Sequence, residues 1–315
     1  MRIALIIFLI FYLIPLGCGS SVTGVEKTKN FMHQLQYKRE KTLVVSNQNG
    51  SIAIQAQEGA DIATVTATIA AVALTDTAAQ EFLDKIDVRF AKEGDELSVE
   101  TIYPKAWTMP AKAKKPSSWK VDYTIIIPDS LDVNCTNVNG EVKVVGANEK
   151  VDIQNMNGEI LVKDNRQETT AIAVNGNIQI SNDQDYNTSV RATTQNGSLS
   201  IDMPKVQVGI FAIRTLNGNI KMSLPSGHEP EIDLSTVNGN IELFLGERLS
   251  GKVELSTTNG KVSTDMVVNT TTGVGGILEK KVIKGVVGAG FGKVKAVTKN
   301  GDVTMNYGEA PTQST

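Results

Sequence analysis

Asn-Gly dipeptides recur along the chain, and apolar and polar residues alternate on both sides of each one. From Asn139 to Asn300 these dipeptides are spaced by 18, 18, 21, 21, 21, 21 and 41 residues. Mostly apolar residues stand six and four positions before each Asn, and again three and five positions after it, with polar residues between them. Alternation with a period of two predicts a half-buried strand on each side of a turn. The chain is therefore expected to be a repeat protein with two strands in each repeat.

The Asn-Gly dipeptides themselves are typical of tight turns. Glycine supplies the positive φ that such a turn needs, and asparagine tolerates left-handed geometry better than most residues. A first dipeptide of this kind begins at Asn49, and the interval before Asn300 is about two repeats long, so it contains either an unmarked repeat or an insertion. We assign a structural role in turns to Asn139, Gly140, Asn157, Gly158, Asn175, Gly176, Asn196, Gly197, Asn217, Gly218, Asn238, Gly239, Asn259, Gly260, Asn300 and Gly301.

The position two residues before each turn Asn distinguishes between two architectures. It holds Asn or Thr in nearly every repeat, for example Asn137, Asn155, Thr215 and Thr236. We expect these side chains to bond to their equivalents in the neighbouring repeats, which requires parallel coils stacked about 4.8 Å apart. The sequence therefore predicts an all-β fold, a parallel β-solenoid of the single-stranded β-helix type with rungs of 18–21 residues. An antiparallel hairpin array or a propeller is the alternative.

The rest of the chain is less regular. Residues 18–41 lack a strand pattern and are interpreted as a tether, partly helical. Residues 42–138 form the irregular N-terminal part of the repeat domain, with a small α/β elaboration that includes a short helix from Thr75 to Leu83 and a strand pair across Gly94 and Asp95. Residues 139–306 form the regular repeats, and residues 307–315 are expected to be a frayed tail.

The N-terminus has the pattern of an export signal. One cation, Arg2, precedes an apolar run of about 14 residues, which is shorter than the roughly 20 residues of a membrane span. We interpret residues 1–17 as a signal peptide. Gly17-Cys18 resembles a bacterial lipobox, although Pro15 stands where Leu is usual. Lipidation of Cys18 is predicted, with simple cleavage or an uncleaved anchor as alternatives. The resemblance implies an exported, membrane-anchored envelope protein, in the outer membrane if the bacterium is Gram-negative.

Composition narrows the classes of function. Acidic and basic side chains nearly balance, 34 against 31, so no excess of cations is available to neutralise a nucleic acid. Two His and two Cys are too few for a multi-ligand zinc or iron–sulfur site, and we expect neither a metal nor a cofactor. Hydrophobic residues make up 41% of the chain, which is enough for a core.

Several segments together resemble a known family. They are the strand and turn from Val44 to Ile52, the strand from Tyr123 to Pro128, the repeated Thr-x-Asn-Gly-x-Ile units and the final run from Lys295 to Val303. Over roughly residues 42–306 the chain is similar to the bacterial "putative adhesin" family, a β-strand-repeat domain of unknown function. The resemblance implies a β-helical envelope protein, often a lipoprotein. It brings no catalytic residues to carry over.

Single residues with chemical potential have plainer interpretations. Cys135 falls in an apolar column and is predicted to be a core thiol. His33 lies in the predicted tether and His228 in a connecting loop, and neither has a second ligand at metal-binding spacing. The glycines between Gly285 and Gly292 depart from the dinucleotide fingerprint, since the last position of that pattern is a lysine, and we expect them to serve turns.

One loop has the composition of a partner-binding segment. Within residues 104–120 it combines two tryptophans with several lysines, a set that stacks on sugars or meets anionic headgroups when exposed. The alternative is a solvated loop with one Trp folded back onto the core. The candidate residues are Trp107, Trp119, Lys112, Lys114 and Lys115.

These features favour a non-enzymatic cell-envelope lipoprotein that presents a β-solenoid surface for adhesion or scaffolding. Its partners would be the membrane, through the lipid, and an envelope glycan or another envelope protein. A structural or sensory envelope module with a protein partner is the alternative. A polysaccharide-cleaving β-helix enzyme is a weaker one, because it needs clustered carboxylates that the outward columns lack.

Overall fold

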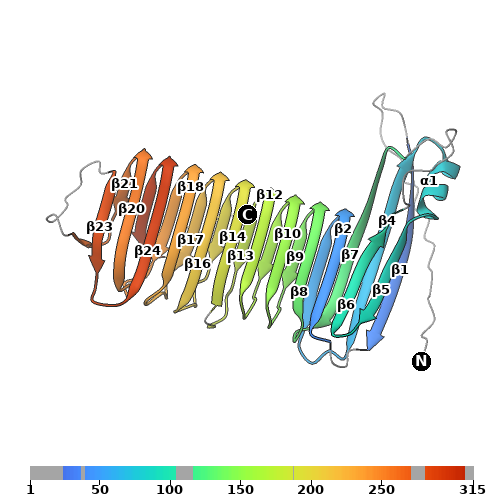
Figure 1. Cartoon of the computed structure of the whole chain (residues 1–315), viewed down its shortest axis with the longest axis horizontal. Helices are drawn as coiled ribbons and strands as arrows, with labels where there is room; N and C mark the ends of the chain where they lie inside the picture. The colour runs from blue at the N-terminus through green and yellow to red at the C-terminus, as the bar shows by residue number, and fades with distance from the viewer. Residues whose placement is uncertain (1–23, 37–39, 104–115, 187, 271–280, 309–315) are drawn as a thin grey trace.

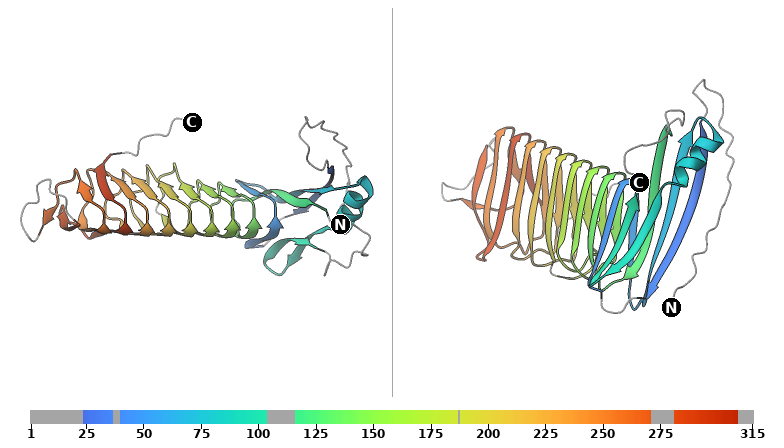
Figure 2. Two further views of the ribbon diagram at one scale, coloured as in Figure 1. Left: turned by 90° about the horizontal axis from the view of Figure 1, so that it is seen from above. Right: turned by 45° about the vertical axis from the view of Figure 1, so that its right-hand side comes forward.

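The computed structural model describes residues 24–36, 40–103, 116–186, 188–270 and 281–308. Most of these residues lie in two open sheets that face each other along the long axis of the molecule (Figures 1 and 2). Among the described residues there is one helix, α1 (Asp76–Leu83). The predicted all-β class is confirmed. Because the sheets are open and neighbouring repeats pair in parallel, the hairpin array and the propeller are excluded.

The two sheets are named A and B. In its order across the sheet, sheet A consists of β1 (Val25–Gln36), β4 (Ile62–Ala73), β7 (Ser118–Pro128), β3 (Ile52–Gln57), β9 (Val142–Val145), β11 (Ile160–Lys163), β13 (Ile178–Ser181), β15 (Leu199–Asp202), β17 (Ile220–Leu224), β19 (Ile241–Leu245), β25 (Val303–Tyr307) and β21 (Val262–Thr264). Sheet B consists of β22 (Asn269–Thr270), β23 (Val282–Val287), β20 (Gly251–Asn259), β24 (Gly292–Asn300), β18 (Glu231–Asn238), β16 (Gly209–Asn217), β14 (Thr188–Asn196), β12 (Thr169–Asn175), β10 (Val151–Asn157), β8 (Asp132–Asn139), β2 (Thr42–Asn49), β6 (Glu96–Ile102) and β5 (Asp87–Glu93).

A strand of sheet B and the following strand of sheet A form one rung. Neighbouring rungs pair without any offset, so that Ile153 lies beside Cys135 in sheet B and Ile160 lies beside Val142 in sheet A. The apolar columns of the sequence therefore become continuous columns between the two sheets, and their members are almost fully buried. Burying each large apolar side chain contributes roughly 1.5–3 kcal/mol relative to exposure, which makes this core the main stabilising feature of the fold.

At the C-terminal end the rungs are not stacked in sequence order. β24 pairs with β18 on one side and with β20 on the other, and β25 lies between β19 and β21 in the same way. The last rung of the sequence is thus inserted between two earlier ones, as the position of red β24 beside orange β20 shows (Figure 1). In the described part of the long interval, β22 and β23 add antiparallel strands to the outer edge of β20. The interval therefore contains an insertion.

The N-terminal end uses the same device. β2 pairs with β8 on one side and with the later strand β6 on the other, while β3 lies between β9 and β7. The first rung is therefore an inner rung, covered by β6 and β7. Beyond them β4 and β1 extend sheet A, and β5 extends sheet B, all by antiparallel pairing. The predicted strand pair around Gly94 and Asp95 is confirmed as β5 and β6.

The segment predicted to be a tether contains a strand. β1 pairs with β4 over its whole length of 12 residues. None of its side chains is fully buried, so the sequence shows no alternation there, and the strand is held by backbone hydrogen bonds to apolar β4. The tether interpretation is wrong for this strand. Residues 1–23 lie outside the described residues.

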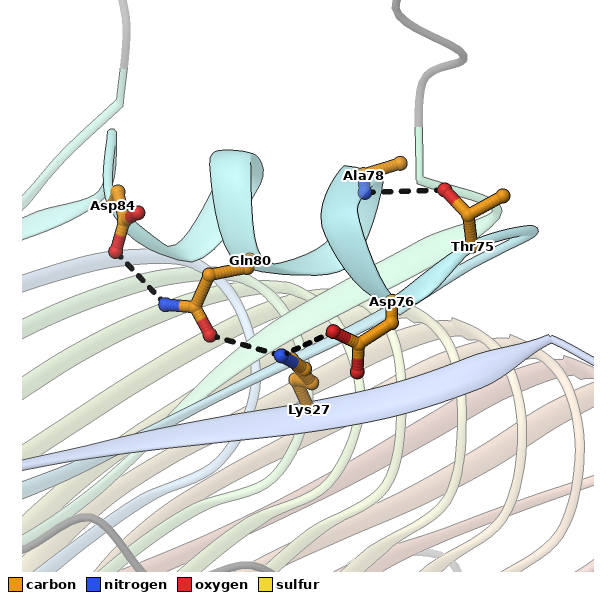
Figure 3. Close-up of polar contacts among 6 residues, drawn as sticks. All are labelled: Lys27, Thr75, Asp76, Ala78, Gln80 and Asp84. Carbon is orange, nitrogen blue, oxygen red and sulfur yellow. Dashed lines mark hydrogen bonds and ion pairs between the residues drawn. The ribbon is translucent and has the colours of Figure 1, made fainter.

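Helix α1 covers the N-terminal end of the stack and packs on β1 and β4 (Figure 3). Its N-cap is Thr75, whose hydroxyl accepts a hydrogen bond from the Ala78 amide at 3.2 Å. From β1, the Lys27 ammonium contacts the Asp76 carboxylate at 2.8 Å and donates to the Gln80 side chain at 3.3 Å. These contacts tie α1 to β1 at the N-terminal end of the stack.

Candidate functional site

The turn asparagines form a continuous ladder along one edge of the stack. Each side-chain amide donates to the side-chain oxygen of the Asn in the preceding rung, at 2.7–2.9 Å. In spatial order the ladder runs through Asn49, Asn139, Asn157, Asn175, Asn196, Asn217, Asn238, Asn300 and Asn259. Its bonds all run in the same direction, so a single amide column joins rungs that are far apart in the sequence.

The column two residues before the turn Asn is bonded differently from what the sequence suggests. Its side chains do not bond to one another. From Asn137 onward, apart from Ala173, they donate to the backbone carbonyl of the turn glycine in the neighbouring rung, as in Thr215 to Gly197 and Thr236 to Gly218, both at 3.0 Å, whereas Asn47 donates to the Val121 carbonyl. The expectation of a like-with-like ladder is therefore wrong for this column and describes the turn asparagines instead.

The turn glycines are required by close stacking. A Cβ at Gly197 would lie 2.0 Å from the Gly176 carbonyl oxygen, and one at Gly218 would lie 1.9 Å from that of Gly197. Gly140 has a φ of +130°, but at Gly176, Gly197 and Gly260 φ lies outside the left-handed region. The positive φ that the sequence suggests therefore explains only some of these glycines. Contact between backbones of adjacent rungs explains them all.

One rung lacks the side chain that bonds to a glycine carbonyl. Ala173 occupies the column between Asn155 and Thr194, beside the carbonyl of Gly158. We expect Ala173→Thr to raise the free energy of unfolding by about 1 kcal/mol, because the hydroxyl would reach that carbonyl as Thr194 reaches Gly176. Denaturant unfolding measures the change. Ala171→Thr is the matched control: Ala171 is buried in the apolar column, so its hydroxyl should destabilise. Equal effects of both changes would contradict this account.

Cys135 is buried between Val45 and Ile153, as the sequence predicts for a core thiol. Burial raises the pKa of its thiol to about 12 from 9.0. Because the thiolate forms more readily in the unfolded chain, stability falls as the pH rises from about 9 towards 12. At pH 8 we expect a thiol reagent to modify Cys135 only when denaturant unfolds the chain. Fast modification of the native protein, followed by mass spectrometry, would show that the site opens.

Only part of the predicted partner-binding loop lies within the described residues. Trp119 belongs to β7 and its ring packs against Phe82 of α1 at 5.6 Å between centroids. It is a structural residue at the N-terminal cap. Trp107, Lys112, Lys114, Lys115 and the lipidation candidate Cys18 lie outside the described residues.

The two histidines lie far from each other in the fold. The His33 ring stacks edge-on against Phe90, at 5.2 Å between centroids, and His228 lies in the connection before β18. The described residues contain no group of three or more His, Cys, Asp and Glu side chains suited to hold a metal ion. Among them, no helix has the length and apolar character that crossing a bilayer requires.

The glycine-rich segment before β24 positions an exposed aromatic side chain. The Ser250 hydroxyl accepts hydrogen bonds from the Ala289 and Gly290 amides, and the Glu229 carboxylate accepts one from the Phe291 amide at 3.3 Å. The turn conformation expected for these glycines is present at Gly288, with a φ of +63°. The side chain of Phe291 is 94% exposed, which is unusual for a large apolar residue held by ordered contacts.

Phe291 lines a groove of about 840 Å³ where the strands of sheet B begin. Val208, Ile210 and Pro230 supply its apolar surface. Charged side chains of both signs surround them, namely Glu168, Arg191, Glu229, Glu231 and Lys293. An aromatic ring with carboxylates, a guanidinium and an ammonium around it can stack on a flat ligand and hydrogen-bond its polar groups. Sequence reasoning missed Phe291 because its column is irregular.

An apolar stripe follows the opposite edge of the same outer face, one residue before five of the nine turn Asn, and the same column holds Gln48, Gln195, Thr258 and Lys299 in the other rungs. We call its members, Val138, Met156, Val174, Leu216 and Val237, the apolar stripe. Met156 is 50% exposed and Leu216 is 47% exposed, and Ile172 beside them is 40% exposed. By contrast, strands β9, β11, β13, β15, β17 and β19 of sheet A carry no exposed large hydrophobic residue. Apolar exposure on these rungs is therefore concentrated on sheet B.

The outer face of sheet B is also divided by charge. From β5 to β12 acidic side chains prevail over Arg89 and Lys150, and we call this the acidic half: Asp87, Glu93, Glu96, Glu100, Asp132, Asp152 and Glu168. From β14 to β23 basic side chains prevail over Glu231, Asp233 and Glu254, and we call this the basic half: Arg191, Arg214, Lys252, Lys284, Lys293, Lys295 and Lys299. In the basic half, Lys284 and the neighbouring lysines lower the pKa of Glu254.

Comparison with known proteins places the chain in a family. The family model described as Toastrack DUF4097 matches residues 41–306. Among solved structures, one described as a "putative adhesin" from Bacteroides fragilis is 13% identical, with 89% of this chain and 97% of that chain covered and a TM-score of 0.45. A "putative lipid binding protein" from Parabacteroides distasonis is 8% identical, with 89% and 97% covered and a TM-score of 0.29. The comparison with curated proteins gives no match.

Proposed function

The chain belongs to the Toastrack DUF4097 family, and from its fold and surface we propose that it is a non-enzymatic envelope protein whose stack presents a surface for adhesion or scaffolding. In this proposal the stack is a β-solenoid with rungs of 18–21 residues marked by Asn-Gly turns. Residues 1–17 direct export, and a lipid on Cys18 anchors the chain to the membrane beyond its N-terminal cap. The family match confirms the family predicted from the sequence, and the proposal adds an interaction surface.

The outer face of sheet B supports this role. A stack whose rungs are joined by core columns and by the Asn ladder holds its surface side chains at fixed spacing. On that face Phe291 and Ile210 are exposed at one edge and Met156 and Leu216 at the other. Exposed apolar groups that a rigid scaffold holds in place are typical of interaction surfaces. The groove at Phe291 suits an envelope glycan, because the ring offers a flat apolar contact and the charged groups offer hydrogen bonds.

Binding to isolated envelopes tests the proposal. The mature chain should co-sediment with purified envelope fragments, and Phe291→Ser should reduce the bound fraction without changing the unfolding midpoint, since Phe291 contributes nothing to the core. Tyr307→Ser is the matched control, because Tyr307 is an exposed aromatic residue of sheet A. Failure of the wild type to bind envelopes, or an equal loss in both variants, would contradict the proposed surface.

The apolar stripe favours a second candidate, a structural or sensory module with a protein partner. Apolar residues without a stacking aromatic ring are more typical of protein interfaces than of glycan sites. Co-purification of an envelope protein that is lost with Leu216→Asp but kept with Phe291→Ser would support this candidate. A polysaccharide-cleaving activity is the weakest candidate, and turnover of an envelope polysaccharide by the purified chain would establish it.

A further inference from the structure

We propose that the outer face of sheet B binds the same face of a second copy of this chain, in the opposite orientation, to form a two-fold symmetric dimer. The inference rests on the second candidate of the proposed function, because it names a second copy of this chain as the protein partner of the apolar stripe. The dimer would cover the groove at Phe291, so glycan binding and association compete for this face. A two-fold interface requires a surface that is complementary to itself. The charge division and the apolar stripe provide such a surface.

The charges fix the relative orientation. A two-fold axis that lies in the interface parallel to the strands, between β12 and β14, reverses the order of the rungs. It places the acidic half of each copy opposite the basic half of the other. β20 then faces β6 of the second copy, and Lys252 approaches its Glu96. β24 faces β2, whose outward side chains are uncharged, and β8 faces β18, where Asp132 lies opposite Glu231, so the attraction comes from the net charges of the two halves and not from a pair at every rung. The reverse choice, with the rungs in the same order, would place each half opposite the half of like charge and weaken association.

The same axis aligns the apolar stripes. Reversal of the rungs keeps each residue at the same level along its strand, so the stripe of one copy meets the stripe of the other. Met156 then lies opposite Leu216 of the second copy, Val138 lies opposite Val237, and next to the axis Val174 lies opposite the polar Gln195. Both Met156 and Leu216 are about half exposed in the single chain, so their mutual burial removes apolar surface from water.

Ion pairs within the chain leave the charge division in place. Asp233 of the basic half is already paired with Arg214 at 2.9 Å, and Glu254 with Lys284 at 2.7 Å. These neutral pairs do not cancel Lys252, Lys295 and Lys299 on the neighbouring strands. The outer face of sheet A shows no comparable division, since Glu141, Lys143, Glu159 and Lys163 alternate there within two adjacent rungs.

The proposed orientation has a consequence for adhesion. The N-terminal cap, with β1 and α1, lies at one end of the stack (Figure 1). In the dimer the two caps lie at opposite ends of the assembly. Lipid anchors that precede the two caps would then attach to the membrane at both ends, or to two different membranes, which a side-by-side dimer with aligned caps would not allow.

Sedimentation equilibrium of the mature chain at low and high salt tests the dimer. We expect a dimer that dissociates as salt screens the charges, and at least a tenfold weaker association for Leu216→Asp. The double variants Lys252→Glu/Lys293→Glu and Glu96→Lys/Glu100→Lys should each weaken association, because each opposes like charges. Their equimolar mixture should regain it, because every contact is then between opposite charges. Lys143→Glu/Lys163→Glu on sheet A is the control and should associate like the wild type.

Several outcomes would overturn the inference. The first is a wild type that is monomeric at about 100 µM, well above the Kd range of specific complexes. The second is an equal loss of association in the sheet A control. The third is an equimolar mixture of the two double variants that does not regain association. Far-UV circular dichroism and the unfolding midpoint of every variant separate lost association from lost folding. A monomer that still binds envelope fragments through Phe291 would overturn the dimer and leave the proposed function standing.

Discussion

Gly197→Ala is expected to destabilise the protein by about 3 kcal/mol, the upper end of the usual cost of forcing extra atoms into a packed site. Its Cβ would lie 2.0 Å from the Gly176 carbonyl oxygen and 2.6 Å from the carbonyl carbon. Neither atom can move alone. The Gly176 amide donates a hydrogen bond to the Asn196 carbonyl, and the Gly176 carbonyl accepts one from the Thr194 hydroxyl. The rungs would have to separate at this level, which breaks the Asn ladder and opens the core. Denaturant unfolding followed by circular dichroism measures the loss.

Gly59→Ala is the matched control for this prediction. Gly59 has a φ of +70°, and a Cβ there would meet nothing within 4 Å. A left-handed alanine costs about 1 kcal/mol, so this variant should be mildly destabilised. The pair separates the two reasons for a glycine, since Gly197 has the contact without the positive φ and Gly59 has the positive φ without the contact. If Gly197→Ala cost no more than Gly59→Ala, close stacking would not be what selects glycine in the turns.

The regular part of the fold could be predicted from the sequence because each rung repeats the same local rule. Apolar columns such as that of Val133, Val151 and Thr169 coincide in space, since neighbouring rungs pair without offset. The order of the end rungs could not be predicted. Nothing in β24 itself distinguishes a strand that follows β20 from one inserted before it, because both positions offer an identical edge. Long-range pairing decides between them, and local sequence does not record it.

The candidate surface was harder to predict than the fold for the same reason. Lys252 and Lys293 are neighbours across β20 and β24 although 41 residues separate the turns of their rungs. The acidic half likewise includes Glu96 and Glu100 only because β6 lies beside β2. The two halves are also separate in the sequence, at residues 87–168 and 191–299, but charges of sheet A and of loops lie between their members. The division appears only when the fold shows which side chains share the outer face of sheet B. Exposure of Phe291 depends on the contacts of Glu229 and Ser250, which sequence periodicity does not indicate.

Removal of residues 288–315 should unfold the whole C-terminal end of the stack, although it deletes only the last rung of the sequence. That rung, β24 and β25, lies between β18 and β19 on one side and β20 and β21 on the other. Its loss leaves β20, β21 and β23 without the neighbour that covers their core side chains. Hydrogen exchange with mass spectrometry should show loss of protection over residues 251–264 as well as loss of the deleted strands.

Truncation after residue 308 provides the control, since it removes only residues beyond β25 and should leave exchange in β20 unchanged. The comparison also bears on how the stack ends. If rungs were laid down in sequence order, deletion of the last one would expose a new end and leave β20 protected by β18. Because β24 intervenes, β20 can be protected after the deletion only by closing a gap one rung wide, which requires Leu255 to meet Leu234 in the place that Ala296 now occupies. Persistent protection of β20 would therefore mean that β20 can pair directly with β18. The observed order of the end rungs would then be favoured in the complete chain but would not be needed for the stack to form.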